Sequence, residues 1–293
     1  MAMPIESSEL IITPEGKVYH IHLHPDELAG LVITVGDPDR VAAVSKYFDA
    51  IEVRSQHREF VAHTGRIGSK RLTVLSSGIG PDNIDIVMNE LDALVNVDFN
   101  TREIKSTHTR LSIIRMGTCG SLQADIPVDS LVASSHGIGL DNVLHYYVPE
   151  QSAEELALQD AFAQHAGLSD SPIRPYAMEG SRELLAWFQQ GYHQGITVTC
   201  PGFYAPQGRV VRAERRFPEL VDRLSSFRFG EHRISNFEME TSAIFGLGRV
   251  FGHRCLAVNT IVANRVEKKF SSNAPAAIDR MIQQSLEIIA DRL

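Results

Sequence analysis

The chain has 293 residues, of which 43% are hydrophobic and 22% are charged, and its formal net charge is −8. This composition excludes a mainly disordered chain, because the apolar residues suffice for a large core. The acidic balance argues against a sequence-independent nucleic-acid binder, which needs a basic surface.

The cysteines and the N-terminal sequence indicate the cellular compartment. Cys119, Cys200 and Cys255 lie far apart without a paired spacing, which favours free thiols in a reducing compartment over a disulfide framework. The first residues lack the basic region and apolar run of a signal peptide. No apolar stretch approaches the roughly 20 residues that cross a bilayer. We therefore expect a cytoplasmic protein without membrane or nucleic-acid partners.

Short apolar runs alternate with helical patterns along the whole chain. In chain order, the patterns predict a strand at Leu31–Val35, a helix at Val41–Phe48, a strand at Arg71–Ser76, a helix at Asp82–Val95, strands at Leu111–Met116, Ser130–Ser134 and Ile196–Thr199, a helix at Met239–Phe251, a strand at Cys255–Ala263 and a helix at Ala274–Leu293. This alternation predicts an α/β fold with helical layers around one central sheet. We expect residues 1–17 to form an N-terminal extension, residues 18–293 to form one domain, and Asn96–Thr109 to be a surface insertion.

Three predicted strands are followed by glycine-containing loops, at Gly36–Arg40, Gly78–Gly80 and Arg115–Gly120. Ligands of open α/β sheets bind where loops leave the carboxyl ends of strands. Glycine lets the backbone approach a ligand, and arginine binds phosphate oxygens with two donors. The first and third loops are therefore candidate anion sites. The alternatives are an ordinary Asp-Pro turn for the first loop and a buried ion pair of Arg115 for the third.

Two further segments carry polar groups that suit a sugar or a base. Glu238-Met239-Glu240 is predicted to open a helix, where a carboxylate either binds vicinal hydroxyls, as on a ribose, or complements the helix dipole. The loop from Phe203 to Arg209 offers an aromatic face, the donor and acceptor of Gln207 and the donors of Arg209. These groups suit the edge of a heterocyclic base, and the alternative is a surface loop.

Two other stretches have strand-like patterns. His20, His22 and His24 alternate as on a strand edge, but no further ligand cluster accompanies them to indicate a metal site. Gln56–Phe60 carries Arg58 on a strand-like stretch, for which a solvated strand face is the simplest interpretation.

Seven ordered motifs resemble the uridine phosphorylase branch of the nucleoside phosphorylase family. The motifs are GDPDR, HREF, SSGIG, RMGTCG, FYAPQGR, NFEMET and VANR, and the resemblance extends from about His20 to the C-terminal helix. It implies a single-domain, three-layer α/β sandwich with a mixed, twisted central sheet, assembled from homodimers into a homohexamer. It also implies reversible phosphorolysis of uridine to uracil and ribose 1-phosphate, with inorganic phosphate as co-substrate and no organic cofactor.

The resemblance also assigns roles to motif residues. Phosphate would be bound by Gly36, Arg40, Arg115 and Thr118 of one chain and by Arg58 of the other chain of the dimer. Ribose would be bound by Met239 and Glu240, and its 5′-hydroxyl by His20 of the neighbouring subunit. Uracil would be bound by Phe203, Gln207 and Arg209. Arg115, Arg209 and Glu240 would be the catalytic residues. Glu59 resembles a glutamate of the potassium site between subunits in some members, although no serine stands at its expected partner position near Pro81–Asn83.

Two rival functions are open at the level of the sequence. A purine phosphorylase or nucleosidase of the same family would carry an aspartate where this chain has Asn264, and a hydrolase would not need the phosphate-binding arginines. A non-catalytic nucleoside sensor would be expected to lose an arginine or Glu240, and none is lost. Ala205-Pro206 and Gly208 depart from the usual base loop of the family, so the choice among uridine, deoxyuridine and thymidine is not predicted.

Overall fold

Fourteen strands and seven α-helices follow one another along residues 4–292, the part of the chain that the computed structural model describes. The strands are β1 (Leu31–Val35), β2 (Ala50–His57), β3 (Phe60–Ile67), β4 (Lys70–Ser76), β5 (Val97–Asp98), β6 (Glu103–Ile104), β7 (Ser112–Ser121), β8 (Leu131–Gly139), β9 (Tyr176–Glu179), β10 (Tyr192–Thr199), β11 (Arg228–Phe229), β12 (His232–Glu238), β13 (Arg254–Asn264) and β14 (Lys269–Phe270). The helices are α1 (Pro38–Ser45), α2 (Pro81–Asn96), α3 (Ala153–His165), α4 (Arg182–Leu185), α5 (Leu220–Ser226), α6 (Thr241–Phe251) and α7 (Ala274–Arg292). Residues 1–3 of the predicted N-terminal extension and Leu293 of the predicted last helix lie outside the described residues.

The central sheet is mixed, as the resemblance to the nucleoside phosphorylase family implies. Strand β1 pairs in parallel with β4 on one side and with β7 on the other, while β2, β3 and β4 pair in an antiparallel arrangement. Strand β13 is parallel to β7 and antiparallel to β8, and β8, β10 and β12 are parallel neighbours. Two further antiparallel pairs join β12 to β7, at Asn236–Ser121 and Phe237–Gly120. This closure makes part of the sheet barrel-like within the confirmed mixed α/β fold.

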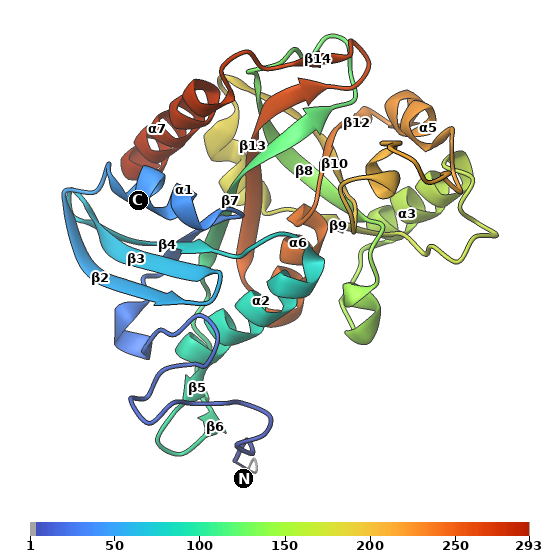
Figure 1. The fold of residues 1–293 in the computed structure, drawn as a ribbon. Helices are drawn as coiled ribbons and strands as arrows, with labels where there is room; N and C mark the ends of the chain where they lie inside the picture. Colours follow the sequence, from blue (N-terminus) through green and yellow to red (C-terminus); the bar gives the residue numbers. More distant parts are fainter. Residues whose placement is uncertain (1–3, 293) are drawn as a thin grey trace.

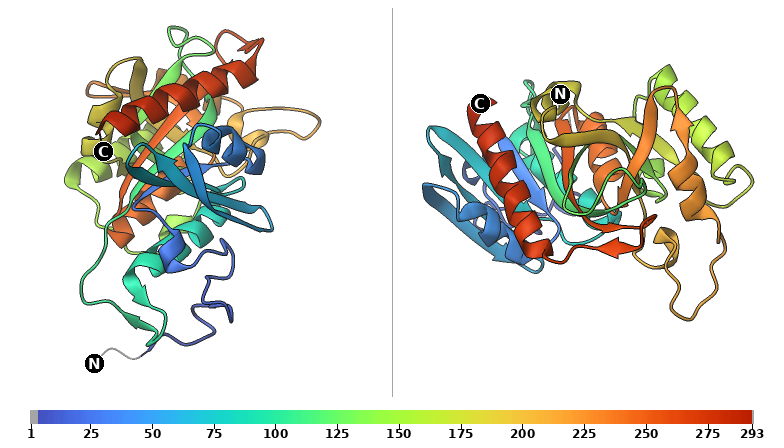
Figure 2. Two further views of the ribbon diagram at one scale, coloured as in Figure 1. Left: turned by 90° about the vertical axis from the view of Figure 1, so that its left-hand side faces the viewer. Right: turned by 90° about the horizontal axis from the view of Figure 1, so that it is seen from above.

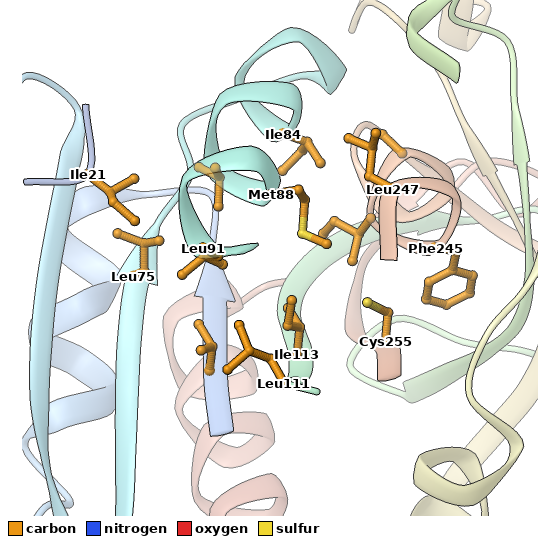
Figure 3. Packing of buried hydrophobic residues seen from close by; sticks show 14 of the residues in the cluster. Ile21, Leu75, Ile84, Met88, Leu91, Leu111, Ile113, Phe245, Leu247 and Cys255 are labelled. Carbon is orange, nitrogen blue, oxygen red and sulfur yellow. The ribbon is translucent and has the colours of Figure 1, made fainter. Parts of the chain in front are cut away.

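Alternate residues of the central strands supply two separate cores. Ile33 of β1 packs with Val41 of α1 and Met281 of α7, whereas its neighbour Val32 packs in the cluster that includes Ile84 of α2. Figure 1 shows α1 and α7 near one another and α2 beside α6 on the other side of the sheet. Figure 3 shows the second core, where side chains of α2 meet those of α6 and the central strands. The period of two along β1 therefore builds a layered sandwich.

Helices α3 and α5 cover the barrel-like end of the sheet. Phe162 of α3 and Phe227, which follows α5, pack edge to face with ring centres 5.5 Å apart, and both belong to a core with Ile196 and Val198 of β10. Figure 2 shows these two helices together, away from α7. The sequence patterns predict neither helix.

The structure corrects several local predictions. Strand β7 continues to Ser121, so Gly117–Gly120 is strand rather than loop, because β13 pairs with it along its length. Gln56–Phe60 spans the turn between β2 and β3, and Arg58 occupies it with φ 55°. Helix α6 begins at Thr241, two residues after its predicted start at Met239.

The alternating histidines do not lie on a strand. His22 has φ 54°, a left-handed conformation that a strand does not contain. His24 precedes the short 3₁₀ helix Pro25–Glu27 and caps it through its ring nitrogen. The sequence Tyr19–His24 is instead a turn that packs against α2 and the β2–β3 hairpin.

The three cysteines are buried free thiols. Burial raises the pKa of Cys119, Cys200 and Cys255, in the last case to about 12. Within residues 4–292, every helix is too short or too polar to cross a membrane.

Candidate functional site

A cavity of about 660 Å³ lies where the strand-end loops meet. Its walls come from the carboxyl ends of β1, β4, β7, β12 and β13 and from the loop after β10. Nine predicted site residues line it: Gly36, Arg40, Glu59, Arg115, Thr118, Phe203, Gln207, Met239 and Glu240. The predicted convergence of the glycine-containing segments on one edge of the sheet is therefore confirmed, while the chemical role of each residue stays a prediction.

Arg115 lies at the centre of a buried charge cluster. Its Nε donates to Glu238 Oε2 at 3.0 Å, and its Nη2 donates to Glu240 Oε2. Its Nη1 is fully buried and has no hydrogen-bond partner within residues 4–292. Gly117 makes room for this guanidinium, because a β-carbon there would collide with the side chains of Arg115 and Asn259. The ion-pair interpretation is therefore confirmed, and the anion site at Arg115 stays a prediction.

Glu238 connects this cluster to the start of α6. Its carboxylate accepts the backbone N–H groups of Glu240 and Thr241 at 2.8 and 3.0 Å, and the hydroxyl of Thr199 at 2.8 Å. With the bond from Arg115, all its acceptor directions are used. The local sequence places Glu238 only at a helix start, and its pairing with a residue 123 positions away has no local signal.

Arg40 supplies a second cation at the same end of the cavity. It lies in the first turn of α1, whose N-terminus is capped by the Asp37 side chain accepting from the Asp39 N–H at 3.0 Å. Burial and the nearby Arg115 lower the pKa of Arg40. Two like charges held close together in a partly dry site favour the binding of an anion between them.

Glu240 lines the cavity and pairs with Arg115. Its Oε1 accepts the Gly80 N–H at 2.8 Å, which joins the loop after β4 to the start of α6. Gly80 has φ 100°, a conformation that glycine adopts without strain. Burial and the neighbouring Glu238 raise the pKa of Glu240 to about 7, against the opposing attraction of Arg115.

The loop after β10 forms another part of the cavity wall, through Phe203 and Gln207. Arg209 stacks on Phe203, with its guanidinium carbon 3.7 Å from the ring centre, and its Nη1 donates to Gln207 Oε1 at 2.6 Å. This bond leaves the Gln207 amide nitrogen free to donate within the cavity that the residue lines. Arg265 holds the same loop by donating to the Gln207 carbonyl at 2.9 Å. The VANR motif contains Arg265, but the sequence alone does not reveal this contact.

Three predicted site residues do not line this cavity: Arg209, which reaches it only through Phe203 and Gln207, and the pair His20 and Arg58, which lie close to one another. The Arg58 guanidinium is 5.7 Å from the centre of the Tyr19 ring, and the Tyr19 and His20 rings pack edge to face at 4.9 Å. His20 instead lines a separate cavity of about 440 Å³ beside α2. One chain thus does not bring His20 and Arg58 to its own Arg115.

Glu59 reaches the main cavity beside an amide rather than a hydroxyl. Asn83 Nδ2 donates to Glu59 Oε1 at 3.4 Å. In the part of the chain that the structure describes, no group of three or more His, Cys, Asp or Glu side chains is arranged to hold a metal ion. A potassium site at Glu59 stays untested.

Comparison with known proteins places the chain in a family. A model of the phosphorylase superfamily matches residues 31–292. A uridine phosphorylase of Thermococcus kodakarensis is 28% identical over 289 residues, which cover 97% of this chain and 91% of the relative. A purine nucleoside phosphorylase of Listeria welshimeri is 23% identical over 243 residues, covering 83% and 85%.

A solved structure agrees with the sequence comparisons. The crystal structure of a Trypanosoma brucei nucleoside phosphorylase, described as showing uridine phosphorylase activity, superimposes with a TM-score of 0.88 and 32% identity. The match covers 96% of this chain and 99% of that one. The chain therefore belongs to the phosphorylase superfamily.

Proposed function

We propose that the chain catalyses the reversible phosphorolysis of uridine to uracil and ribose 1-phosphate, as a pentosyltransferase without an organic cofactor. One observation carries the proposal: a single cavity is lined by two cationic arginines, a buried carboxylate and Gln207. The similarity to uridine phosphorylases over nearly the whole chain supports the same function.

The cationic end would bind inorganic phosphate. Arg40 and Arg115 supply charge, and Gly36 and Thr118 supply neighbouring donors. A phosphate oxygen attacks C1′ while the bond from C1′ to N1 of uracil breaks, and the electron pair of that bond leaves with the base. Holding phosphate beside C1′ removes much of the entropic cost of a bimolecular encounter. Its negative charge also stabilises the cationic sugar that develops.

The remaining residues would hold the ribose and the leaving base. Glu240, with Met239 beside it, accepts hydrogen bonds from the ribose hydroxyls. The departing uracil gains negative charge on its oxygens, which the donors of Gln207 and Arg209 stabilise. The aromatic ring of Phe203 lines the cavity and offers a stacking face for the base.

The purine alternative is disfavoured by the surroundings of Asn264. Its amide nitrogen donates to the carbonyls of Gln123 and Ile126, at 2.9 and 3.0 Å. Its oxygen accepts the N–H groups of Val266 and Glu267. All four hydrogen-bonding directions are thus used by the backbone, so this side chain has none left for a purine ring.

The complete site would need two chains. His20 and Arg58 are far from Arg115 in the sequence and lie together outside its cavity, as expected of residues that serve a neighbouring subunit. A neighbouring subunit can close the open rim of the cleft and exclude water without a mobile lid. The proposed assembly is a homodimer that builds a homohexamer.

The direct test is uracil release from uridine, followed by ultraviolet absorbance with and without phosphate. We expect turnover only with phosphate, and a kcat/KM for uridine far above that for inosine or adenosine. Comparable values for inosine would contradict pyrimidine specificity. Release without phosphate would indicate a hydrolase, and tight binding without turnover would indicate a sensor.

The pH dependence of the reaction should report the ionisation of Glu240. Its raised pKa means that the carboxylate gains a proton as the pH falls through about 7. A protonated Glu240 accepts fewer hydrogen bonds, so kcat/KM for uridine should fall over this range. Inorganic phosphate also titrates near neutral pH and would change the same profile. The pH profile of Glu240→Gln is therefore the reference, because this variant keeps the titration of phosphate and removes that of Glu240. Identical profiles for the two proteins would contradict the assignment.

A further inference from the structure

Glu90 of α2 makes an unusual set of contacts with the turn that carries His20. Its carboxylate accepts the backbone N–H of His20 at 2.9 Å and that of Ile21 at 2.8 Å. Its Oε1 also lies 2.6 Å from the His20 ring nitrogen Nδ1. Glu90 is buried, whereas about 29% of the His20 side chain is exposed. A buried carboxylate thus holds both the backbone and the ring of a partly exposed histidine.

This contact fixes the chemical form of the histidine. An ionised carboxylate only accepts hydrogen bonds, so Nδ1 must carry the proton that it donates to Glu90. In the neutral ring, Nε2 then carries a lone pair, and this nitrogen has no hydrogen-bond partner among residues 4–292. Edge-to-face contacts with Tyr19 and Phe60, at 4.9 and 6.3 Å, restrain the ring plane. The ring is held in one orientation with one acceptor available.

We propose that Glu90 is a positioning residue for the phosphorolysis reaction of the neighbouring subunit. It holds His20 as the Nδ1–H tautomer, so that Nε2 accepts a hydrogen bond from the 5′-hydroxyl of a ribose bound by the partner. This inference rests on the proposed function and on the two-chain site. A purely structural Glu90 would need only its bonds to the backbone, and the bond to the ring distinguishes the two roles.

The variant Glu90→Gln separates these roles. A glutamine keeps one oxygen for the backbone N–H groups but places an NH₂ donor in the other position. Where that donor faces Nδ1, the ring must carry its proton on Nε2, so Nε2 can only donate to the 5′-hydroxyl, and the ring no longer has a carboxylate behind it to strengthen the contact. We expect kcat/KM for uridine to fall about three- to tenfold and kcat/KM for 5′-deoxyuridine to change little.

Glu155→Gln is the matched control. Glu155 is also a buried carboxylate that accepts backbone N–H groups, from Ser152 and Glu179, but it pairs with Arg249 and does not line the main cavity. Its replacement should lower stability without changing the ratio of uridine to 5′-deoxyuridine activity. A ratio that falls equally in both variants would overturn the proposal.

Mixed oligomers test which chain Glu90 serves. The reference mixture combines His20→Ala with Glu240→Ala under conditions that exchange subunits, and recovered activity confirms the two-chain site. Glu90→Gln should then recover activity with Glu240→Ala but not with His20→Ala, because Glu90 and His20 serve the same site from the same chain. Recovery with His20→Ala would overturn the proposal.

Failure of the proposed function, of the two-chain site and of the Glu90 role can be told apart. A wild-type chain that does not cleave uridine refutes the proposed function. An active chain whose reference mixture shows no recovery refutes the two-chain site, and either result also overturns the role of Glu90. Should Glu90→Gln not assemble, Glu90→Asp replaces it in a double-mutant cycle with His20→Ala. The double variant should then be no slower on uridine than His20→Ala alone, and additive losses would overturn the proposal.

Discussion

Replacing Arg115 by alanine should destabilise the chain and also abolish its stabilisation by phosphate. Glu238 and Glu240 would lose the cation that they share, and breaking a buried ion pair by removing one partner costs about 3–5 kcal/mol. Phosphate bound at the proposed site should stabilise the wild-type chain, since it would bind only the folded state, and this increment should disappear with its main cationic ligand. Urea unfolding of both proteins, with and without phosphate, measures the two effects separately.

The matched control for this experiment is Arg249→Ala. Arg249 also pairs with a buried carboxylate, that of Glu155, but does not line the main cavity. This variant should lose stability and keep the full increment from phosphate. If Arg115→Ala behaved in the same way, Arg115 would be a structural ion pair and the proposed phosphate site would be wrong.

Replacing Arg209 by alanine should raise the barrier for uridine cleavage by about 2–4 kcal/mol, the range observed for loss of one donor to a developing anion. The change removes a donor, the stacking partner of Phe203 and the bond that fixes the Gln207 amide. Because the charge on uracil develops during the reaction, kcat should fall together with kcat/KM. Steady-state kinetics with uridine at saturating phosphate measures both constants.

Arg212→Ala provides the comparison for Arg209. Arg212 is exposed in the same loop region, so its removal changes the net charge equally. Its kinetics should remain close to those of the wild type. An increase in KM at constant kcat for Arg209→Ala would indicate that Arg209 binds the ground state and the transition state equally.

The central strands could be predicted because their signal is local. Leu31–Val35 matches β1 at both ends, and the predicted Arg71–Ser76 differs from β4 by one residue. Strand β12 was not predicted: its sequence mixes polar and apolar residues, and it is a strand because it pairs with β10 and β7. Helix α3 was also missed, although Ser152 and Glu155 form a capping box at its start.

The residues of the candidate site could be predicted from local motifs, but the contacts between them could not. The motifs single out Arg115 and Glu240, which both line the cavity, since each lies within a short recognisable segment. They do not reveal that the two side chains bond to one another across 125 positions, or that Glu90 reaches back 70 positions to His20. Such pairs depend on strand order and helix packing, which a single sequence does not specify.

The buried thiols have a consequence for the way this protein can be studied. The reactive form of cysteine is the thiolate. Burial disfavours the thiolate of Cys119, Cys200 and Cys255, so these residues should react slowly with alkylating reagents in the folded protein. Modification of a fully buried thiol requires a transient opening of the surrounding structure. Cys119 lines the main cavity and Cys255 a second one, whereas Cys200 is fully buried in the core with Ile196 and Val198, so the alkylation rate of Cys200 measures how often this core opens. The native sequence thus contains its own probe of internal motion, without any introduced label.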